Sequence, residues 1–339
     1  MQINQLNGSQ SRFGELLSRM QCPECHGTLA FSSSAFTCTA CGRSYTVADG
    51  VGHFVPAESY ASSFGFQWTK YARTQLDTDQ MHYSEQAFRS RTGLTPELLH
   101  GKWVLDVGCG MGRFAEVASR WGANVVGVDL SRAALVAADN LAGRDNAFFI
   151  RSDLFKLPFA PESFDFIYSI GVLHHTPDCQ AAFKALPKYL ALGGTIAIWL
   201  YSGYNRWYRF SDIYRRYTSR MKPETLHALC QFAGPLYEIQ QGLKKIPLVG
   251  KTASGLLQYV LPISHFPIRE WRVLDTFDWY SPTYQSKHTY EEVFRWFEDV
   301  GLVDLHVGEE SIAVRGTKAA SGARHSRRED ASALERVGT

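Results

Sequence analysis

Four cysteines near the N-terminus have the clearest chemical spacing in the sequence. They form two C-x-x-C pairs, Cys22 with Cys25 and Cys38 with Cys41. Two such pairs can place four thiolates at about 2.3 Å from one tetrahedral Zn²⁺. In a reducing compartment this pattern favours a metal over disulfides. The sequence therefore predicts a structural zinc with no open coordination position for a catalytic water, and His26 is expected to be a surface residue. The alternative is four reduced, free cysteines.

A glycine-rich turn is the second chemical feature. Residues 104–112 read VLDVGCGMG and stand between an apolar run and a helical pattern. In open α/β sheets, ligands bind beyond the carboxyl ends of the strands, and glycines let the backbone approach them. A dinucleotide fingerprint needs Gly or Ala at the sixth position of the motif, where this chain has Arg113. The turn therefore predicts a bound ligand, and this departure counts against a nicotinamide dinucleotide.

Acidic and polar residues stand at three successive predicted strand ends. Asp106, just before the turn, would repel a pyrophosphate but can pair with an α-ammonium group. Asp129 ends the next strand, where ribose hydroxyls could donate to its carboxylate. Ser152 and Asp153 follow the third strand and could bind an adenine amino group. S-adenosylmethionine (SAM) has the ammonium, the ribose and the adenine without a phosphate, and is the expected cofactor.

Residues 101–200 resemble the class I SAM-dependent methyltransferases. The segments VLDVGCGMG, VVGVD and FDFIYSIGVLHH follow one another in the order of that family. The resemblance implies methyl transfer from SAM, with Gly171 and Val172 near the sulfonium. The candidate cofactor-binding residues are Asp106, Gly108, Cys109, Gly110, Gly112, Asp129, Leu130, Ser152, Asp153, Leu154, Ile170, Gly171 and Val172.

The N-terminal segment resembles a second family. The string from CPECHGTLAF to CGRSYTVADGVGHFVP is similar to the small Trm112-type zinc domain. The resemblance implies a zinc ribbon that partners, or is fused to, a methyltransferase. Loss of zinc is expected to unfold this module without directly abolishing the contacts to SAM.

Candidate catalytic residues are few, because a sulfonium methyl group is already activated. The protein then mainly aligns the acceptor and excludes water. A positioned base would still add about 10² to 10⁴ in rate for a hydroxyl or amine acceptor. The candidates are His174, His175, Tyr280 and His288, with a structural or cofactor-lining role as the alternative for His174. Tyr280 is placed in a polar and aromatic loop, 277–285, that either builds an acceptor pocket or only packs, and 64–68 is a candidate lid over SAM.

Alternating strand and helix patterns from residue 102 onward must position these residues. The order is typical of βαβ units and predicts an α/β fold, a Rossmann-like seven-stranded, mostly parallel sheet with helices on both faces. Gly193 and Gly194 are expected to end the helix before the fifth strand. A strand hairpin at 303–315 is expected to close the sheet. A small N-terminal zinc ribbon and a helical cap insertion complete the expected architecture.

The predicted organisation has seven segments. They are an N-terminal tail (1–18), a zinc ribbon (19–57), a helical lid or linker (58–100), the SAM-binding core (101–202), a helical cap (203–280), a C-terminal helix and strand hairpin (281–318) and a disordered tail (319–339).

Composition sets broad limits on the protein. With 339 residues, 45% hydrophobic and 20% charged, the chain is globular and long enough for one large and one smaller unit. A net charge of +2 gives no sign of a nucleic-acid partner. Residues 1–10 lack the apolar core of a secretory signal, and the most apolar stretch, 246–263, is too short and mixed to span a bilayer. We expect a cytoplasmic protein without a transmembrane segment.

Three functions are compatible with these features. The first is methyl transfer to a small-molecule, glycan or lipid-linked acceptor bound by residues 203–280. There, arginines at 206, 209, 215 and 216 alternate with aromatic residues, as on a surface for an anionic or membrane-bound acceptor or on a solvated amphipathic helix. The alternatives are an RNA methyltransferase that binds RNA through the ribbon and a non-catalytic SAM-binding or scaffold protein. Neither the acceptor atom (O, N or C) nor the oligomeric state follows from the sequence.

Overall fold

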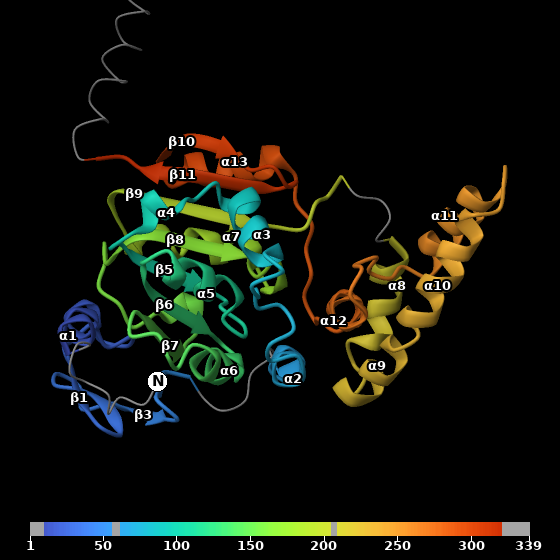
Figure 1. Ribbon diagram of the computed structural model, residues 1–339. Helices are drawn as coiled ribbons and strands as arrows, with labels where there is room; N and C mark the ends of the chain where they lie inside the picture. Colours follow the sequence, from blue (N-terminus) through green and yellow to red (C-terminus); the bar gives the residue numbers. More distant parts are fainter. Residues whose placement is uncertain (1–9, 56–61, 205–208, 321–339) are drawn as a thin grey trace, which may run out of the picture.

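A twisted, mainly parallel sheet forms the centre of the molecule (Figure 1). The computed structural model describes residues 10–55, 62–204 and 209–320. In that part of the chain, the seven expected strands lie in the order β7-β6-β5-β8-β9-β11-β10. Only β11, between β9 and β10, runs antiparallel to its neighbours. The strands are β5 (Trp103–Val107), β6 (Asn124–Asp129), β7 (Ala147–Arg151), β8 (Phe164–Ile170), β9 (Leu190–Trp199), β10 (Leu302–Val307) and β11 (Ala313–Lys318).

Helices cover both faces of this sheet, which confirms the predicted fold class. Successive residues of a strand point to opposite faces, so Val104 and Leu105 enter different hydrophobic clusters. One cluster joins Leu105 to α1 (Gln10–Arg19), α7 (Cys179–Lys184) and α13 (Tyr290–Asp299). The other joins Val104 to α3 (Tyr83–Thr92), α5 (Arg113–Arg120) and α6 (Ala133–Asn140). Burial on both faces explains why all five residues of β5 are buried.

The N-terminal module extends the same sheet. Its strands are β1 (Leu29–Ser32), β2 (Ala35–Cys38), β3 (Ser44–Ala48) and β4 (Val51–His53). β4 pairs in parallel with β7 through the registers Gly52 to Ile150 and His53 to Arg151. The expected tail at 1–18 contains α1 in its described part, because Phe13, Leu16 and Leu17 lie on one helical face that packs into the core.

Two helical groups stand around the sheet. α2 (Ser62–Lys70), α3 and α4 (Pro96–Leu99) occupy the expected lid segment. The cap consists of α8 (Arg209–Thr218), α9 (Pro223–Cys230), α10 (Ala233–Lys244), α11 (Gly250–Val260) and α12 (Arg269–Tyr280), which lie beside the sheet in Figure 1. The expected disorder of the tail concerns residues that, from 321 onward, lie outside the described part of the chain.

Two local expectations were wrong. Residues 277–280 belong to α12 and not to a loop, because Val273, Leu274, Phe277 and Tyr280 recur at helical spacing and are all buried. Residues 193 and 194 lie within β9, whereas α7 already ends at Lys184. A short 3-10 turn, 187–189, replaces the last part of the expected helix.

No helix among the described residues has the length and apolar character needed to cross a bilayer.

Candidate functional site

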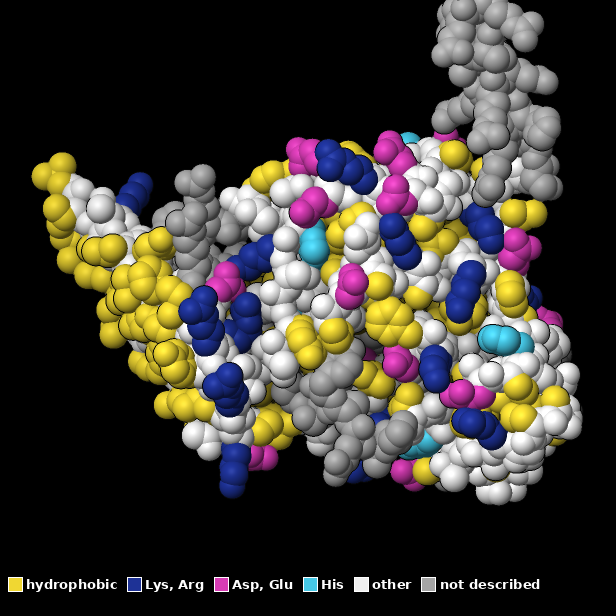
Figure 2. All heavy atoms as spheres, turned by 180° about the vertical axis from the view of Figure 1, so that it is seen from behind, with side chains coloured by type: hydrophobic (Ala, Val, Ile, Leu, Met, Phe, Trp, Pro, Cys, Tyr) yellow, Lys and Arg dark blue, Asp and Glu magenta, His cyan; other side chains and the backbone are white. Residues whose placement is uncertain are grey.

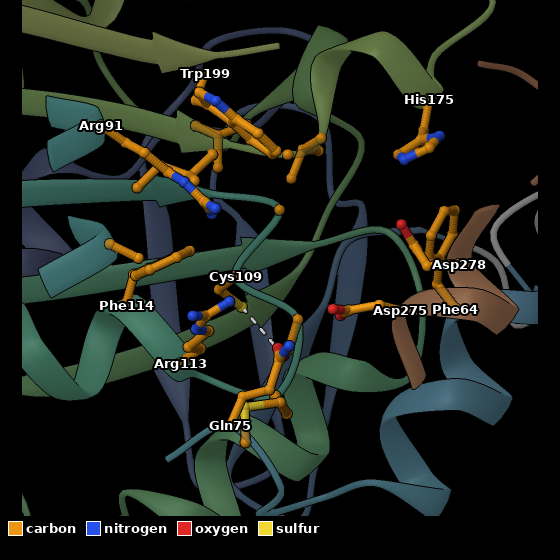
Figure 3. Close-up of a pocket in the computed structure, with 18 of the residues that line it drawn as sticks. Phe64, Gln75, Arg91, Cys109, Arg113, Phe114, His175, Trp199, Asp275 and Asp278 are labelled. Carbon is orange, nitrogen blue, oxygen red and sulfur yellow. Dashed lines mark hydrogen bonds between the residues drawn. The ribbon is translucent and has the colours of Figure 1, made fainter. Parts of the chain in front are cut away.

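A cavity of about 1210 Å³ opens at the carboxyl ends of β5, β6, β7 and β8. Figure 3 shows side chains from the strand ends facing it, with Asp275 and Asp278 of α12 on the opposite side. Most candidate cofactor-binding residues line this cavity. They are Gly108, Cys109, Gly110, Asp129, Leu130, Ser152, Asp153, Leu154, Ile170, Gly171 and Val172.

Asp129 holds the glycine turn in place from the end of β6. One carboxylate oxygen, Oδ2, accepts a hydrogen bond from the backbone N–H of Gly110 at 3.0 Å. The other, Oδ1, accepts from the backbone N–H and the hydroxyl of Ser131 at 2.8 and 2.7 Å. Burial raises the pKa of Asp129, while these hydrogen bonds act in the opposite direction. The same carboxylate therefore orders the turn and faces the cavity.

The glycines of the turn are required by packing as well as by backbone conformation. Gly108 and Gly110 have φ values of +80° and +52°. A Cβ on Gly108 would lie 2.4 Å from the Val172 side chain, and one on Gly110 would lie 3.1 Å from Nε1 of Trp68. Trp68 belongs to α2, so the expected lid does rest on the glycine turn.

Two candidate cofactor residues do not line the cavity. Gly112 begins α5 with φ +88°, and a Cβ there would meet Leu141 and Ala137. Asp106 is 3% exposed, and its Oδ2 has no hydrogen-bond partner within the described residues. Burial raises the pKa of Asp106 to about 8, and the charge of Asp129 adds to this shift. In the structure, both residues lie in the packing behind the turn.

Of the four candidate bases, only His175 lines the cavity, although the ring centroid of His174 lies 4.2 Å from that of His175. Its Nδ1 lies 3.0 Å from the carbonyl oxygen of Tyr284, and burial lowers its pKa. His174 is fully buried, with its ring stacked at 4.0 Å on Tyr201.

Tyr280 and His288 point into packing contacts. The Tyr280 hydroxyl donates to the carbonyl oxygen of Pro262 at 2.8 Å, whereas His288 Nε2 lies 2.7 Å from the Ser286 hydroxyl. Neither side chain lines the cavity.

Sequence reasoning missed a cationic wall of the cavity. The Arg113 guanidinium lies 4.9 Å from the ring centroid of Trp271, and its Nε donates to the Ser84 hydroxyl at 2.9 Å. Burial lowers the pKa of Arg113 to about 9. Arg91 lies 4.0 Å over the ring of Trp199. Arg113 was visible in the sequence only as a departure from the dinucleotide motif.

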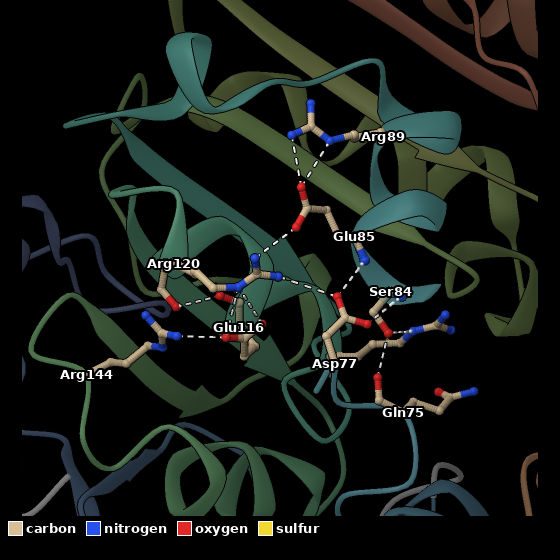
Figure 4. Close-up of polar contacts among 10 residues, drawn as sticks. Gln75, Asp77, Ser84, Glu85, Arg89, Glu116, Arg120 and Arg144 are labelled. Carbon is tan, nitrogen blue, oxygen red and sulfur yellow. Dashed lines mark hydrogen bonds and ion pairs between the residues drawn. The ribbon is translucent and has the colours of Figure 1, made fainter. Parts of the chain in front are cut away.

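A polar network outside the cavity fixes the position of Ser84 (Figure 4). Asp77 accepts the backbone N–H groups of Ser84 and Glu85 at 2.8 and 2.9 Å, at the N-terminus of α3. Arg120 of α5 then bridges Glu85 and Asp77 at 2.8 and 3.4 Å. The Ser84 hydroxyl donates to the Gln75 carbonyl oxygen at 2.5 Å. These contacts tie α3 to α5 and hold the Arg113 side chain at the wall.

The four cysteines predicted to bind zinc come together. Their sulfur atoms all lie within 4.8 Å of one another, with 3.8 Å between Cys22 and Cys41 and 3.4 Å between Cys25 and Cys38. Four sulfurs around one tetrahedral zinc would lie about 3.8 Å apart. All four cysteines are free of disulfides. The arrangement is compatible with a closed metal site.

Comparisons with known proteins agree with this geometry. Residues 105–198 match a family model described as a methyltransferase domain. The ubiquinone biosynthesis O-methyltransferase of Coxiella burnetii (strain Dugway 5J108-111) is 31% identical over 139 residues, 40% of this chain and 59% of that protein. The sterol 24-C-methyltransferase erg6 of Schizosaccharomyces pombe is 26% identical over 145 residues, 41% of this chain and 37% of that protein.

A solved SAM-dependent methyltransferase from Mesorhizobium loti is 35% identical over 34% of this chain and 52% of that chain, with a TM-score of 0.30. The chain thus spans between about a third and three fifths of the length of these relatives. The matched segment contains the glycine turn, Asp129 and the strand ends that surround the cavity. On this evidence, residues 105–198 form a methyltransferase domain of the class I SAM-dependent type.

Proposed function

We propose that the protein transfers a methyl group from SAM to a small-molecule, glycan or lipid-linked acceptor. The single observation that carries this proposal is the cavity, which runs from Asp129 at the end of β6 to His175 and Asp278. Pockets for one ligand usually measure about 300 to 1,000 Å³. A volume of about 1210 Å³ suits a cofactor and an acceptor together.

The strand ends provide what the cofactor needs. Asp129 offers carboxylate oxygens to ribose hydroxyls, while Ser152 and Asp153 are positioned for the adenine. Asp153 already accepts from the backbone N–H of Phe155 at 3.0 Å through Oδ1, which fixes its carboxylate. Arg113, whose Nε donates to Ser84 and whose charge is partly balanced by Asp275, suits the carboxylate of the amino-acid part. Asp106 is buried and does not line the cavity, so we assign it no direct contact with the ammonium.

The chain's own residues complete the chemistry. SAM, when bound, supplies an activated methyl group. His175 is the best placed candidate base, because burial lowers its pKa and keeps the ring neutral and able to accept a proton near pH 7. Trp199 and Tyr201 form the wall beside it and exclude water from the acceptor.

The cysteine cluster is proposed to hold a structural zinc in the N-terminal ribbon. The site is linked to the cofactor region through β4 and Arg151 of β7. The Arg151 guanidinium contacts His53 Nδ1 at 3.2 Å and donates to the Ser131 carbonyl oxygen at 3.2 Å. Ser131 is also a hydrogen-bond donor to Asp129. Zinc would thus support one wall of the SAM site at a distance.

An apolar or lipid-linked acceptor is the favoured class. The cavity wall formed by the cap and α3 is rich in aromatic residues, including Tyr83, Phe266, Trp271 and Trp279. Two relatives are named for sterol and ubiquinone chemistry. RNA binding through the ribbon finds less support, because residues 19–57 contain two basic and two acidic residues and carry no net charge.

The proposal is tested by calorimetric titration of SAM and S-adenosylhomocysteine, followed by acceptor screening. We expect both ligands to bind and S-adenosylhomocysteine to accumulate with an acceptor from the apolar or lipid-linked pools. His175→Gln should then lower turnover by about 10² to 10⁴ without weakening SAM binding. His306→Gln, an exposed histidine of β10, is the matched control. Binding of SAM without turnover on any acceptor would favour the scaffold function instead.

A further inference from the structure

The cap exposes an unusually apolar surface on α10 and α11. Phe232, Ile239 and Ile246 are seven residues apart; Ile239 lies within α10, Phe232 directly precedes the helix and Ile246 follows two residues after its end. Their exposed fractions are 39%, 55% and 49%. Val249, directly before α11, and Leu256, within it, are 63% and 65% exposed. Soluble proteins rarely expose a contiguous apolar patch of this kind without a partner.

The two helices present these stripes together. α10 and α11 pack side by side, and the buried Gln240 donates to Gln258 Oε1 at 3.1 Å across their contact. Between them, Leu248 is 100% exposed with φ +67°, a conformation in which Gly or Asn is usual. Figure 2 shows hydrophobic side chains gathered over this projection, with Lys and Arg side chains along its border. We call this surface, residues 232–260, the apolar ledge.

The charge around the ledge indicates an anionic partner. Residues 229–261 contain one acidic residue, Glu238, and three lysines, Lys244, Lys245 and Lys251. The whole cap from 209 to 280 has ten basic and six acidic residues, a net charge of +4, whereas the full chain carries +2. A second copy docked on the same ledge would bring these cations together. An apolar surface with a basic border instead fits an anionic interface that also accepts hydrophobic side chains.

We propose that the apolar ledge docks on an anionic lipid surface. Hydrophobic side chains of α10 and α11 enter the boundary of the acyl chains, and the lysines pair with acidic head groups. The ledge is firmly joined to the cavity wall, because the Arg272 guanidinium of α12 lies 3.5 Å over the ring of Tyr237 in α10. Docking itself does not depend on the proposed methyl transfer; only the delivery of a lipid-linked acceptor rests on it.

Vesicle sedimentation of the full chain tests this proposal. We expect binding to phosphatidylglycerol-containing vesicles, weak binding to pure phosphatidylcholine, and release by salt. Leu248→Asp should weaken binding at least about tenfold, and Lys244→Glu with Lys245→Glu should remove the preference for phosphatidylglycerol. Val307→Asp, at a 53% exposed residue of β10, is the matched control and should bind as the unchanged chain does.

Three outcomes would overturn the proposal. One is failure of the unchanged chain to bind phosphatidylglycerol vesicles, and another is equal loss of binding in Val307→Asp. The third is a dimer in size-exclusion chromatography that Leu248→Asp dissociates, since a second copy would then cover the ledge. SAM titration of each variant reports separately on folding. If the unchanged chain does not bind SAM, the proposed function is contradicted, whereas the vesicle result is unaffected.

Discussion

At the scale of single residues, Asp129 combines two roles in one carboxylate. It accepts three hydrogen bonds from Gly110 and Ser131, and it faces the cavity where ribose hydroxyls would donate to it. Because the hydrogen bonds of Asp129 hold the glycine turn through protein groups alone, the turn is ordered independently of the cofactor. Such an arrangement reduces the entropy that binding must overcome.

Replacing this carboxylate should weaken cofactor binding. We expect Asp129→Ala to cost about 1 to 3 kcal/mol in SAM affinity, through loss of a charge-assisted hydrogen-bond pair. Isothermal titration calorimetry measures the change, and Glu298→Ala on the exposed face of α13 is the control. Asp129→Asn, which keeps one oxygen acceptor, should have a SAM affinity between those of Asp129→Ala and the unchanged chain. Unchanged affinity in Asp129→Ala would place the ribose elsewhere.

Asp106 gives a prediction about pH. Its pKa is raised to about 8 by burial, whereas an unfolded aspartate has a pKa of about 3.9. Between these values the folded chain binds a proton that the unfolded chain lacks, so this residue makes stability fall as pH rises. The effect is at most about 1.4 kcal/mol per pH unit.

The neutral variant Asp106→Asn removes this proton uptake. Urea unfolding at several pH values measures the free energy of unfolding. Between pH 5 and 7.5, this free energy should fall by at least about 1 kcal/mol less in the variant than in the unchanged chain. Glu298→Gln is a surface control that should follow the unchanged chain. Parallel stability curves for Asp106→Asn and the unchanged chain would contradict a raised pKa at this carboxyl.

At the scale of elements, sequence reasoning succeeded where the evidence was local. The glycine turn, the residue ending β6 and the C-x-x-C pairs each lie within a few positions, so their spacing located them, while their binding of SAM and zinc stays a prediction. The cationic wall could not be predicted this way, because Arg113 meets Trp271 only through the packing of α12 against the sheet edge. Which of the two histidines faces the cavity could not be predicted either, since a 3-10 turn at 173–175 decides it.

The ribbon supplies a prediction about metal. We expect one zinc per chain, released by denaturation and measured with a colorimetric chelator. Cys25→Ser should lose most of this zinc and raise hydrogen exchange in β3, β4 and β7. His26→Asn changes the exposed neighbour of Cys25 and should retain the metal. Zinc retained by Cys25→Ser, or equal loss in both variants, would argue against the four-thiolate site.

At the scale of the whole molecule, charge is divided unevenly. The cap from 209 to 280 carries +4, so the remainder of the chain carries −2. The ribbon and the strand ends of the sheet therefore lie in the less basic part of the molecule. Long-range attraction of polyanions would act on the cap and not on the ribbon.

This division predicts weak binding to RNA. In a filter-binding assay at about 0.15 M salt, we expect no retention of structured RNA that depends on the ribbon, because binding to phosphates needs a basic surface. Arg43→Glu, in the ribbon, should behave as the unchanged chain. Tight retention with a steep dependence on salt, lost in Arg43→Glu, would favour the RNA methyltransferase function.

The pairing of β4 with β7 has a consequence for how the protein can be divided. β7 would become an open edge if the chain were cut at residue 57, with the backbone groups that now face Gly52 and His53 left unpaired. Exposed edges of this kind recruit other chains, so a methyltransferase core prepared alone should be prone to aggregation. By pairing with β7, the ribbon thus prevents strands of other chains from adding to the sheet at this edge.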